Sequence, residues 1–296
     1  MTEDILSLLD KHKSPYKLLV NGEFKISSIS IISNAKAGDV SYLMDQNSPL
    51  LEQLSDMLLI VPTDFVASNN KINYLFIDDP KLAFYRISHL FGNNNQFILD
   101  KAQCEKYPGA HIGINCSIGN NVTIHPEVTI RSNTVLGDNV TIESGCVIGS
   151  TGLLWTWNED KSEKVMLFFT GGTEIKANTY LCANVTVVRG ACNEATLIGE
   201  QVMVAPGSAI GHGCQIGDFT HLANNVTLGG NVKIGKYCFL GSQSCLLPSV
   251  SLLEHSVLGA SSSLTKPATK AGVYIGTPAK YLKPVSNDLK GIPRSN

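Results

Sequence analysis

His212 and Gly230, eighteen residues apart, could together catalyse a reaction, the first through its imidazole and the second through its unobstructed backbone. A neutral imidazole can take a proton from an attacking amine or hydroxyl, and a backbone N–H without an obstructing side chain can stabilise an oxyanion. This combination suits an acyl transfer, provided that the two residues lie side by side. The remaining histidines apart from His221 have no second polar group at a telling spacing; they are His12, His89, His111, His125 and His255.

A six-residue period predicts the element that would bring these two residues together. Every sixth residue from Ile198 to Leu264 is aliphatic, and the same period runs from Ile112 to Ile148 and from Ile175 to Val187. Four residues after most of these comes a small or β-branched side chain. One large and one small inward position per hexapeptide are typical of a triangular coil. We therefore predict a left-handed parallel β-helix, mainly β, in which residues eighteen apart stack at about 4.8 Å.

The period divides the 296-residue chain into three predicted parts. Residues 1–105 lack it and indicate a small α/β domain in front of the coil. Residues 106–265 form the predicted β-helix, and residues 266–296 a C-terminal tail. In the first part we expect helices over Thr2–Lys11, with Thr2 as N-cap, and from Asp79 to Phe91. The strands expected there are Ser28–Ser33, Val40–Met44, Leu58–Val61 and Tyr74–Ile77.

Residues 150–173 interrupt the predicted coil. They contain four aromatic residues, which favour a binding loop over a mere linker. These are Trp155, Trp157, Phe168 and Phe169.

A second interruption separates Val187 from Ile198 by eleven residues instead of six. Two registers are therefore open for the residue stacked under His212. One places Glu194 there, where a carboxylate would orient the imidazole and stabilise the imidazolium. The other places Arg189 there, whose charge would lower the histidine pKa.

Composition excludes several classes of function. A net charge of −2 with scattered signs provides no basic field for nucleic acid. The acidic start does not resemble a secretory signal, and the longest apolar run, near 57–61, is too short to span a bilayer. We expect a soluble, cytoplasmic protein without membrane insertion.

The eight cysteines lack Cys-x-x-Cys spacing, so we predict reduced thiols and no metal site. Four of them occupy the small inward position of the repeat; they are Cys116, Cys146, Cys214 and Cys238.

Two families resemble different parts of the chain. The segments from His212 to His221, from Gly230 to Gly241 and from Gly276 to Lys280 resemble hexapeptide N-acetyltransferases that modify nucleotide-linked amino sugars with acetyl-CoA. Earlier segments resemble the UDP-3-O-(3-hydroxyacyl)glucosamine N-acyltransferases of lipid A synthesis; they are Ile29–Asp45, Asp79–Phe91 and Val187–Ala191. Both resemblances imply homotrimers with sites between neighbouring coils.

These resemblances imply roles for individual residues. His212 would be the general base and Gly230 the oxyanion-binding backbone. An acyl-CoA site would contain His221, Gly241 and Lys280. In the first part, Tyr42 would stack on the nucleotide base, with Asp45 beside it in the nucleotide-sugar site.

The sequence also departs from both families. Gly213 follows the histidine where the acetyltransferases usually have an acidic residue, and Pro248–Val250 lacks the second histidine of the lipid A enzymes. The chain ends sixteen residues after Lys280, without the helical extension that docks an acyl carrier protein. The absence of the second histidine and of the helical extension favours acyl-CoA over a carrier protein as the donor.

We therefore expect an acyltransferase that moves a short acyl group, with acetyl as first choice, from acyl-CoA to the amine of a nucleotide-linked amino-deoxy sugar for surface polysaccharide. It would need no bound cofactor and no metal. Three alternatives remain open. They are a lipid A-type enzyme that uses acyl carrier protein, a non-catalytic β-helix that binds a nucleotide sugar, and a metal-dependent carbonic anhydrase, for which only His212 and His221 are available.

Overall fold

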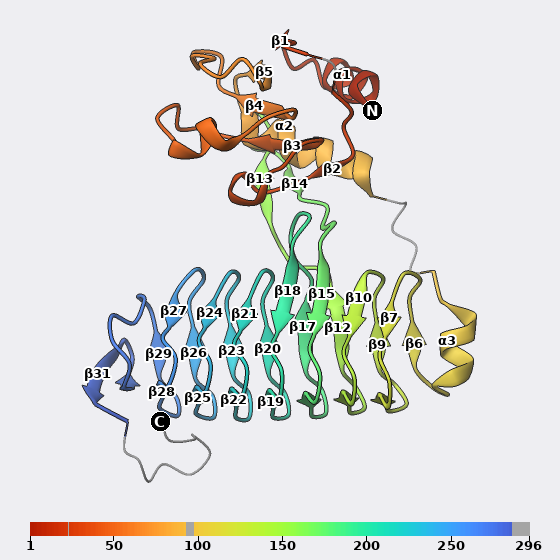
Figure 1. Cartoon of the computed structure of the whole chain (residues 1–296). Helices are drawn as coiled ribbons and strands as arrows, with labels where there is room; N and C mark the ends of the chain where they lie inside the picture. The colour runs from red at the N-terminus through yellow and green to blue at the C-terminus, as the bar shows by residue number, and fades with distance from the viewer. Residues whose placement is uncertain (23, 93–97, 286–296) are drawn as a thin grey trace. The chain divides into compact units, whose positions relative to one another are not determined.

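The computed structural model describes residues 1–22, 24–92 and 98–285, and it divides into two units (Figure 1). The first unit contains the described residues of 1–96 together with 153–170 and 191–194. The second contains the described residues of 97–152, 171–190 and 195–296. The division differs from the expected one in two ways. The first unit ends before residue 105, and most of the 150–173 loop belongs to it.

The first unit is built on a five-stranded sheet of order β1-β5-β4-β3-β2. Strand β1 runs antiparallel to β5, and the other neighbours are parallel. Helix α2 packs on the sheet and α1 packs on α2. The elements are α1 (Thr2–Lys11), β1 (Tyr16–Leu19), β2 (Ser28–Ile29), η1 (Ile32–Asn34), β3 (Asp39–Tyr42), η2 (Pro49–Gln53), β4 (Leu58–Val61), β5 (Asn73–Ile77), α2 (Pro80–Ser88) and η3 (His89–Phe91).

Both predicted helices of this unit are present. Met1, not Thr2, is the N-cap of α1, because the helix already begins at Thr2. Asp79 caps α2 by accepting the N–H of Leu82 at 2.9 Å, and Pro80 occupies the first turn, where it needs no donor. All four predicted strands are present; Leu58–Val61 has the predicted bounds, and the other three differ at one or both ends. Strand β1 was not predicted; it lies at the edge of the sheet, and its residues alternate between half-buried and exposed.

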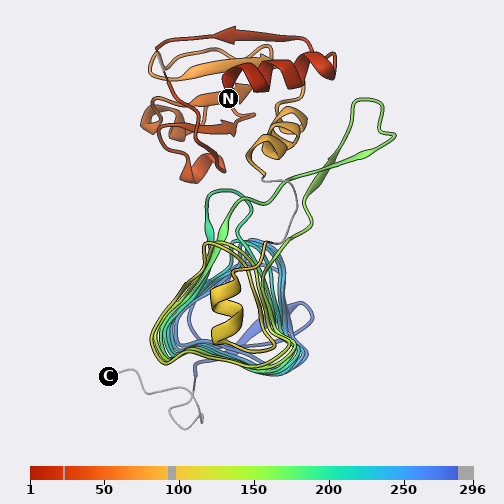
Figure 2. The same cartoon turned by 90° about the vertical axis from the view of Figure 1, so that its right-hand side faces the viewer.

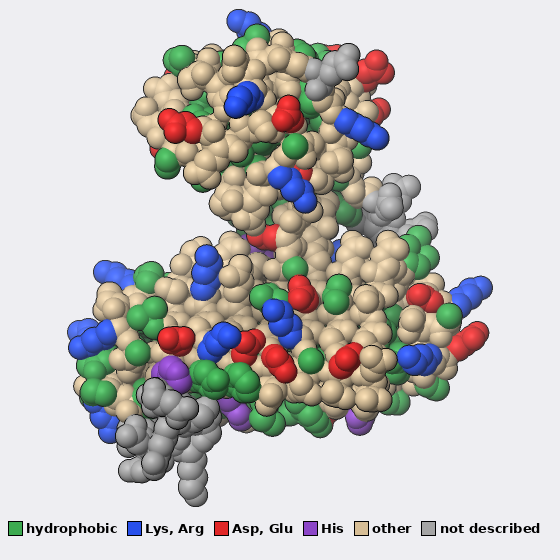
Figure 3. Space-filling model, in the orientation of Figure 1, with side chains coloured by type: hydrophobic (Ala, Val, Ile, Leu, Met, Phe, Trp, Pro, Cys, Tyr) green, Lys and Arg blue, Asp and Glu red, His purple; other side chains and the backbone are tan. Residues whose placement is uncertain are grey.

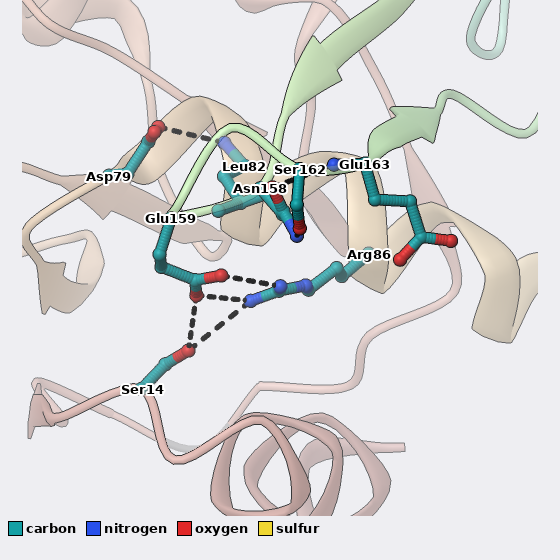
Figure 4. Close-up of polar contacts among 8 residues, drawn as sticks. All are labelled: Ser14, Asp79, Leu82, Arg86, Asn158, Glu159, Ser162 and Glu163. Carbon is teal, nitrogen blue, oxygen red and sulfur yellow. Dashed lines mark hydrogen bonds and ion pairs between the residues drawn. The ribbon is translucent and has the colours of Figure 1, made fainter.

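A hairpin from the predicted loop completes the first unit. Strands β13 (Trp155–Trp157) and β14 (Lys164–Met166) are antiparallel, and between them lies Glu159. The carboxylate of Glu159 accepts two hydrogen bonds from the Arg86 guanidinium of α2, at 2.6 and 2.8 Å (Figure 4). Ser88 Oγ accepts the N–H of Phe168 at 2.8 Å. These contacts explain why the loop belongs to this unit.

The second unit is a left-handed parallel β-helix, as predicted, and Figure 2 shows its triangular cross-section. Three sheets form its faces. The eight-stranded sheet contains β29 (Ser263–Leu264), β26 (Cys245–Leu246), β23 (Thr227–Leu228), β20 (Ala209–Ile210), β17 (Thr186–Val188), β12 (Val147–Ser150), β9 (Thr129–Ile130) and β6 (His111–Ile112). The seven-stranded sheet contains β27 (Ser251–Leu252), β24 (Lys233–Ile234), β21 (Gln215–Ile216), β18 (Ala195–Ile198), β15 (Gly172–Ile175), β10 (Thr134–Leu136) and β7 (Ser117–Ile118). The nine-stranded sheet contains β31 (Ala279–Lys283), β30 (Val273–Gly276), β28 (Val257–Leu258), β25 (Phe239–Leu240), β22 (His221–Leu222), β19 (Met203–Val204), β16 (Tyr180–Leu181), β11 (Thr141–Ile142) and β8 (Thr123–Ile124).

The core of the coil contains the periodic aliphatic residues. Ile210, Leu222 and Leu240 are fully buried, as the period requires. The small inward position is also buried at Cys146, Cys214 and Cys238, whereas Cys116 is half-buried. Burial raises the pKa of the Cys214 thiol to about 12, so this thiol stays protonated and packs as a small apolar group. All eight cysteines are free.

Both ends of the coil are covered. Helix α3 (Lys101–Lys106) packs on β6 at the first coil. At the other end, β30 pairs parallel with β28, and β31 pairs antiparallel with β30. The expected tail of 266–296 therefore contributes two strands to the nine-stranded sheet. Such caps cover the apolar residues of a terminal coil, which no further repeat would bury.

Surface and helix content add two observations. On the face of the second unit drawn in Figure 3, acidic and basic side chains are interspersed. Within the described residues, no helix is both long enough and apolar enough to cross a membrane.

Candidate active site

The stacking predicted for His212 and Gly230 is confirmed. Ile210 of β20 pairs with Leu228 of β23, so the residues two positions later occupy equivalent places in successive coils. A Cβ built on Gly230 would lie only 2.3 Å from Nε2 of His212. The imidazole therefore lies where any side chain at position 230 would be.

Among the backbone donors at this corner, the N–H of Asn231 and that of Gly230 differ in the hydrogen bonds they make within the described residues. The N–H of Asn231 donates to the carbonyl oxygen of His212 at 2.7 Å and holds the two coils together. The N–H of Gly230, in contrast, donates no hydrogen bond within the described part of the chain. An unused N–H beside an imidazole is the geometry that an oxyanion needs.

Electrostatics favour the neutral form of this histidine. Burial lowers the pKa of His212 below its ordinary value of 6.5. The imidazole is therefore mostly unprotonated near neutral pH and available as a base. The turn that carries it is fixed by the next residue, because the N–H of Gly213 donates to Oγ1 of the buried Thr196 at 2.9 Å.

Of the two residues that could stack under His212, the strand register places Arg189 there. Val187 of β17 pairs with Ile210, so Arg189 and His212 both follow two residues after a paired position. The alternative that stacks Glu194 under His212 does not match this register. Residues 191–194 belong to the first unit, where the Glu194 carboxylate accepts the N–H of Ala191 at 3.1 Å. A contact of Glu194 with the Asn34 side chain, at 3.4 Å, also lies within that unit.

The three residues expected to contact acyl-CoA belong to one face of the coil. His221 lies on β22, Gly241 directly follows β25, and the exposed Lys280 lies on β31, all in the nine-stranded sheet. The His221 ring packs 5.3 Å from that of Phe239, and burial lowers the pKa of His221. His212 lies elsewhere in the same coil, at the corner between the eight-stranded and seven-stranded sheets.

The two residues expected to bind the nucleotide sugar lie close together in the first unit. The half-buried Tyr42 ends β3, and its ring centroid lies 5.1 Å from that of Phe84. Burial raises the pKa of the Tyr42 hydroxyl. The exposed Asp45 accepts the N–H of Asn47 at 2.9 Å, which shapes the following turn. Their ligand roles stay predictions.

A pocket of about 390 Å³ in the first unit was missed by sequence reasoning. It contains the Arg86–Glu159 ion pair, whose partners are far apart in sequence and belong to no repeat. Within the described residues, no three side chains of the kinds His, Cys, Asp and Glu are grouped so as to hold a metal ion. The pocket is lined by His12, Lys13, Ser14, Pro15, Ile77, Asp78, Asp79, Leu82, Ala83, Arg86, Asn158, Glu159 and Asp160.

Family models match parts of the coil. Residues 115–150 and 195–230 match the family described as bacterial transferase hexapeptide (six repeats). Residues 231–266 match the hexapeptide repeat of succinyl-transferase. Together with the fold, these matches show a left-handed β-helix built of hexapeptide repeats of the kind found in bacterial transferases.

Two curated enzymes of the same name are similar to the chain over most of its length. The chain is 28% identical to a UDP-3-O-acylglucosamine N-acyltransferase of Coxiella burnetii over 285 residues, which cover 86% of this chain and 83% of that protein. It is 27% identical to the enzyme of the same name from Helicobacter pylori over 227 residues, 67% of this chain and 66% of that one.

Solved structures show the same fold. The UDP-N-acetylglucosamine acyltransferase of Francisella novicida superposes with a TM-score of 0.52 at 25% identity, over 58% of this chain and 60% of that one. LpxA from Acinetobacter baumannii superposes with a TM-score of 0.51 at 23% identity, over 62% of this chain and 70% of that one.

Proposed function

We propose that this protein transfers a short acyl group, with acetyl as first choice, from acyl-CoA to the amine of a nucleotide-linked amino-deoxy sugar. The observation that carries the proposal is the neutral imidazole of His212 lying over Gly230, next to an unused backbone N–H. The relatives support the acceptor class, because their name describes N-acylation of a UDP-linked sugar.

The proposed reaction is a direct attack on the thioester. The amine nitrogen bonds to the thioester carbonyl carbon while Nε2 of His212 takes its proton, and the N–H of Gly230 stabilises the resulting oxyanion. Collapse of this intermediate breaks the carbon–sulfur bond. The imidazolium returns the proton to the leaving sulfur, so the products are an amide and free CoA, and no acyl-enzyme forms.

The proposed donor site implies a second copy of the chain. His221, Gly241 and Lys280 share the nine-stranded face, whereas His212 lies at a corner that does not border it. A donor on that face of one copy would reach His212 of a neighbouring copy, so we propose a homotrimer with sites between coils. Co-expression of His212→Asn with His221→Ala chains would then restore part of the activity that each variant lacks alone.

A second candidate is N-acylation of a UDP-linked acylglucosamine, the acceptor that the relatives' name describes, with the acyl carrier protein implied by the resemblance as donor of a 3-hydroxyacyl group. The similarity to the Coxiella burnetii enzyme over 86% of this chain favours it. The two candidates share the acceptor chemistry and differ in the donor.

Mass spectrometry of the products tests both candidates. The purified protein is incubated with UDP-linked and dTDP-linked amino sugars, and with either acetyl-CoA or 3-hydroxyacyl carrier protein. We expect an acetylated product from CoA that His212→Asn does not form. A product from the carrier protein alone would select the second candidate. No product from any pair would overturn acyl transfer and leave a binding protein.

A further inference from the structure

Arg189, the residue stacked under His212, is a half-buried cation whose hydrogen bonds within the described residues all go to carbonyl oxygens. Its Nε donates to the oxygen of Gly149 at 2.9 Å, and one Nη donates to the oxygen of Ser132 at 2.8 Å. A guanidinium has five donors in a fixed fork, so three of them are not used in these bonds. The carbonyl contacts fix the orientation of the group but supply no negative charge.

No carboxylate of the described residues forms an ion pair with this cation. Within the described parts of the chain, the ion pairs involve Met1, Arg86 and Lys236, and none includes Arg189. Burial, and next the nearby charge of Arg131, lower the pKa of Arg189. A half-buried cation next to another cation is stabilised when an anion binds to it.

The position of the guanidinium matches the length of the proposed acceptor. Arg189 leaves the coil one strand spacing below His212, and its side chain extends to Gly149 and Ser132 on the two coils below its own. The guanidinium therefore lies roughly 10 Å from the level of His212, at about 4.8 Å per coil. In a nucleotide sugar, the sugar ring and the glycosidic oxygen supply part of this length, and the hydrogen bonds from the amine to His212 and from the phosphate to the guanidinium supply the rest.

We infer that Arg189 binds the diphosphate of the nucleotide-linked acceptor. The free Nη donors form charge-assisted hydrogen bonds to phosphate oxygens, in the planar geometry for which arginine is suited. Arg189 is then a positioning residue, because it fixes the distance from the diphosphate to the amine at His212 and touches no reacting atom. This inference rests on the acceptor class of the proposed function.

Calorimetry with nucleoside diphosphates and nucleosides tests it. The probes are UDP and dTDP, compared with uridine and thymidine, and the variants are Arg189→Met and Arg189→Lys. We expect the wild type to bind at least one diphosphate more tightly than its nucleoside. Arg189→Met should weaken diphosphate binding by about 10–100-fold, the usual size for hydrogen bonds to a charged group, with nucleoside binding unchanged. Arg189→Lys should retain part of the preference, and it also serves if Arg189→Met fails to fold.

The control variant is Lys101→Met, which removes an exposed cation from α3 and should change neither affinity. If Arg189 has only a structural role, Arg189→Met should weaken the binding of the diphosphate and of the nucleoside alike. Three results would overturn the inference. They are an equal loss of affinity for diphosphate and nucleoside in Arg189→Met, a preference for the diphosphate that is unchanged in Arg189→Met, and a wild type that does not prefer the diphosphate. Because binding needs no acyl transfer, failure of the proposed function shows separately, as absence of product despite an Arg189-dependent diphosphate preference.

Discussion

The coil corner at His212 and the hairpin contact of the first unit use polar groups in opposite ways. At the hairpin contact, Arg86 is only 9% exposed and its charge is matched by the Glu159 carboxylate through two short hydrogen bonds. At the corner, Arg189 has only carbonyl partners, and the N–H of Gly230 has none in the described chain. Groups that satisfy one another stabilise a fold, whereas groups with unused capacity are available to a ligand.

The largest effect is expected at the corner, on activity alone. Replacing a positioned general base costs about 10²–10⁴-fold in rate, so His212→Asn should lose that much turnover and keep its thermal stability. Turnover is measured from the acylated product, and Tm by calorimetry. Near-wild-type turnover would break the comparison, because the corner would then have no catalytic histidine.

The hairpin contact should show the reverse, a loss of stability. Glu159→Gln leaves the buried Arg86 charge unmatched, and we expect a cost of about 1–3 kcal/mol in unfolding free energy, measured by denaturant titration. Glu163→Gln, an exposed change in the same hairpin, is the matched control. Equal stability of both variants would mean that the ion pair does not hold the hairpin.

The same ion pair predicts how that difference depends on pH. The Arg86 guanidinium lowers the pKa of Glu159 from 4.5 to about 2. A carboxyl group with a lowered folded-state pKa stabilises the fold fully above its unfolded pKa, and this contribution is lost as pH falls through the folded one. The Tm gap between wild type and Glu159→Gln should therefore shrink between about pH 4.5 and pH 2. A gap that stays constant over this range would contradict the assignment.

The smallest effect is expected at Tyr42. If its ring stacks on the nucleotide base, Tyr42→Ala should weaken nucleotide-sugar binding by roughly 1–1.5 kcal/mol and leave acyl-CoA binding unchanged, as measured by calorimetry. Tyr42→Phe keeps the ring and should bind normally. Unchanged affinity in Tyr42→Ala would mean that the ring only packs against Phe84.

The repeat explains why the corner was predictable and the hairpin contact was not. A six-residue period makes neighbours in space readable from spacing, which is why His212 and Gly230 were paired correctly. The eleven-residue gap after Val187 does not fit the six-residue period, so two ways of counting repeats were open there. Only the strand register of the structure showed that Arg189 lies below His212. Arg86 and Glu159 lie 73 residues apart with no period between them. Strands β30 and β31 were missed because they lack the hexapeptide pattern.

The pH dependence of kcat, compared between wild type and His212→Asn, tests the central claim that a neutral His212 is the general base. Because burial lowers the pKa of this imidazole, the wild-type rate should fall only below about pH 6.5, as His212 becomes protonated in the enzyme–substrate complex. The residual rate of His212→Asn should lack this fall. An acid limb that persists unchanged in the variant would contradict the account.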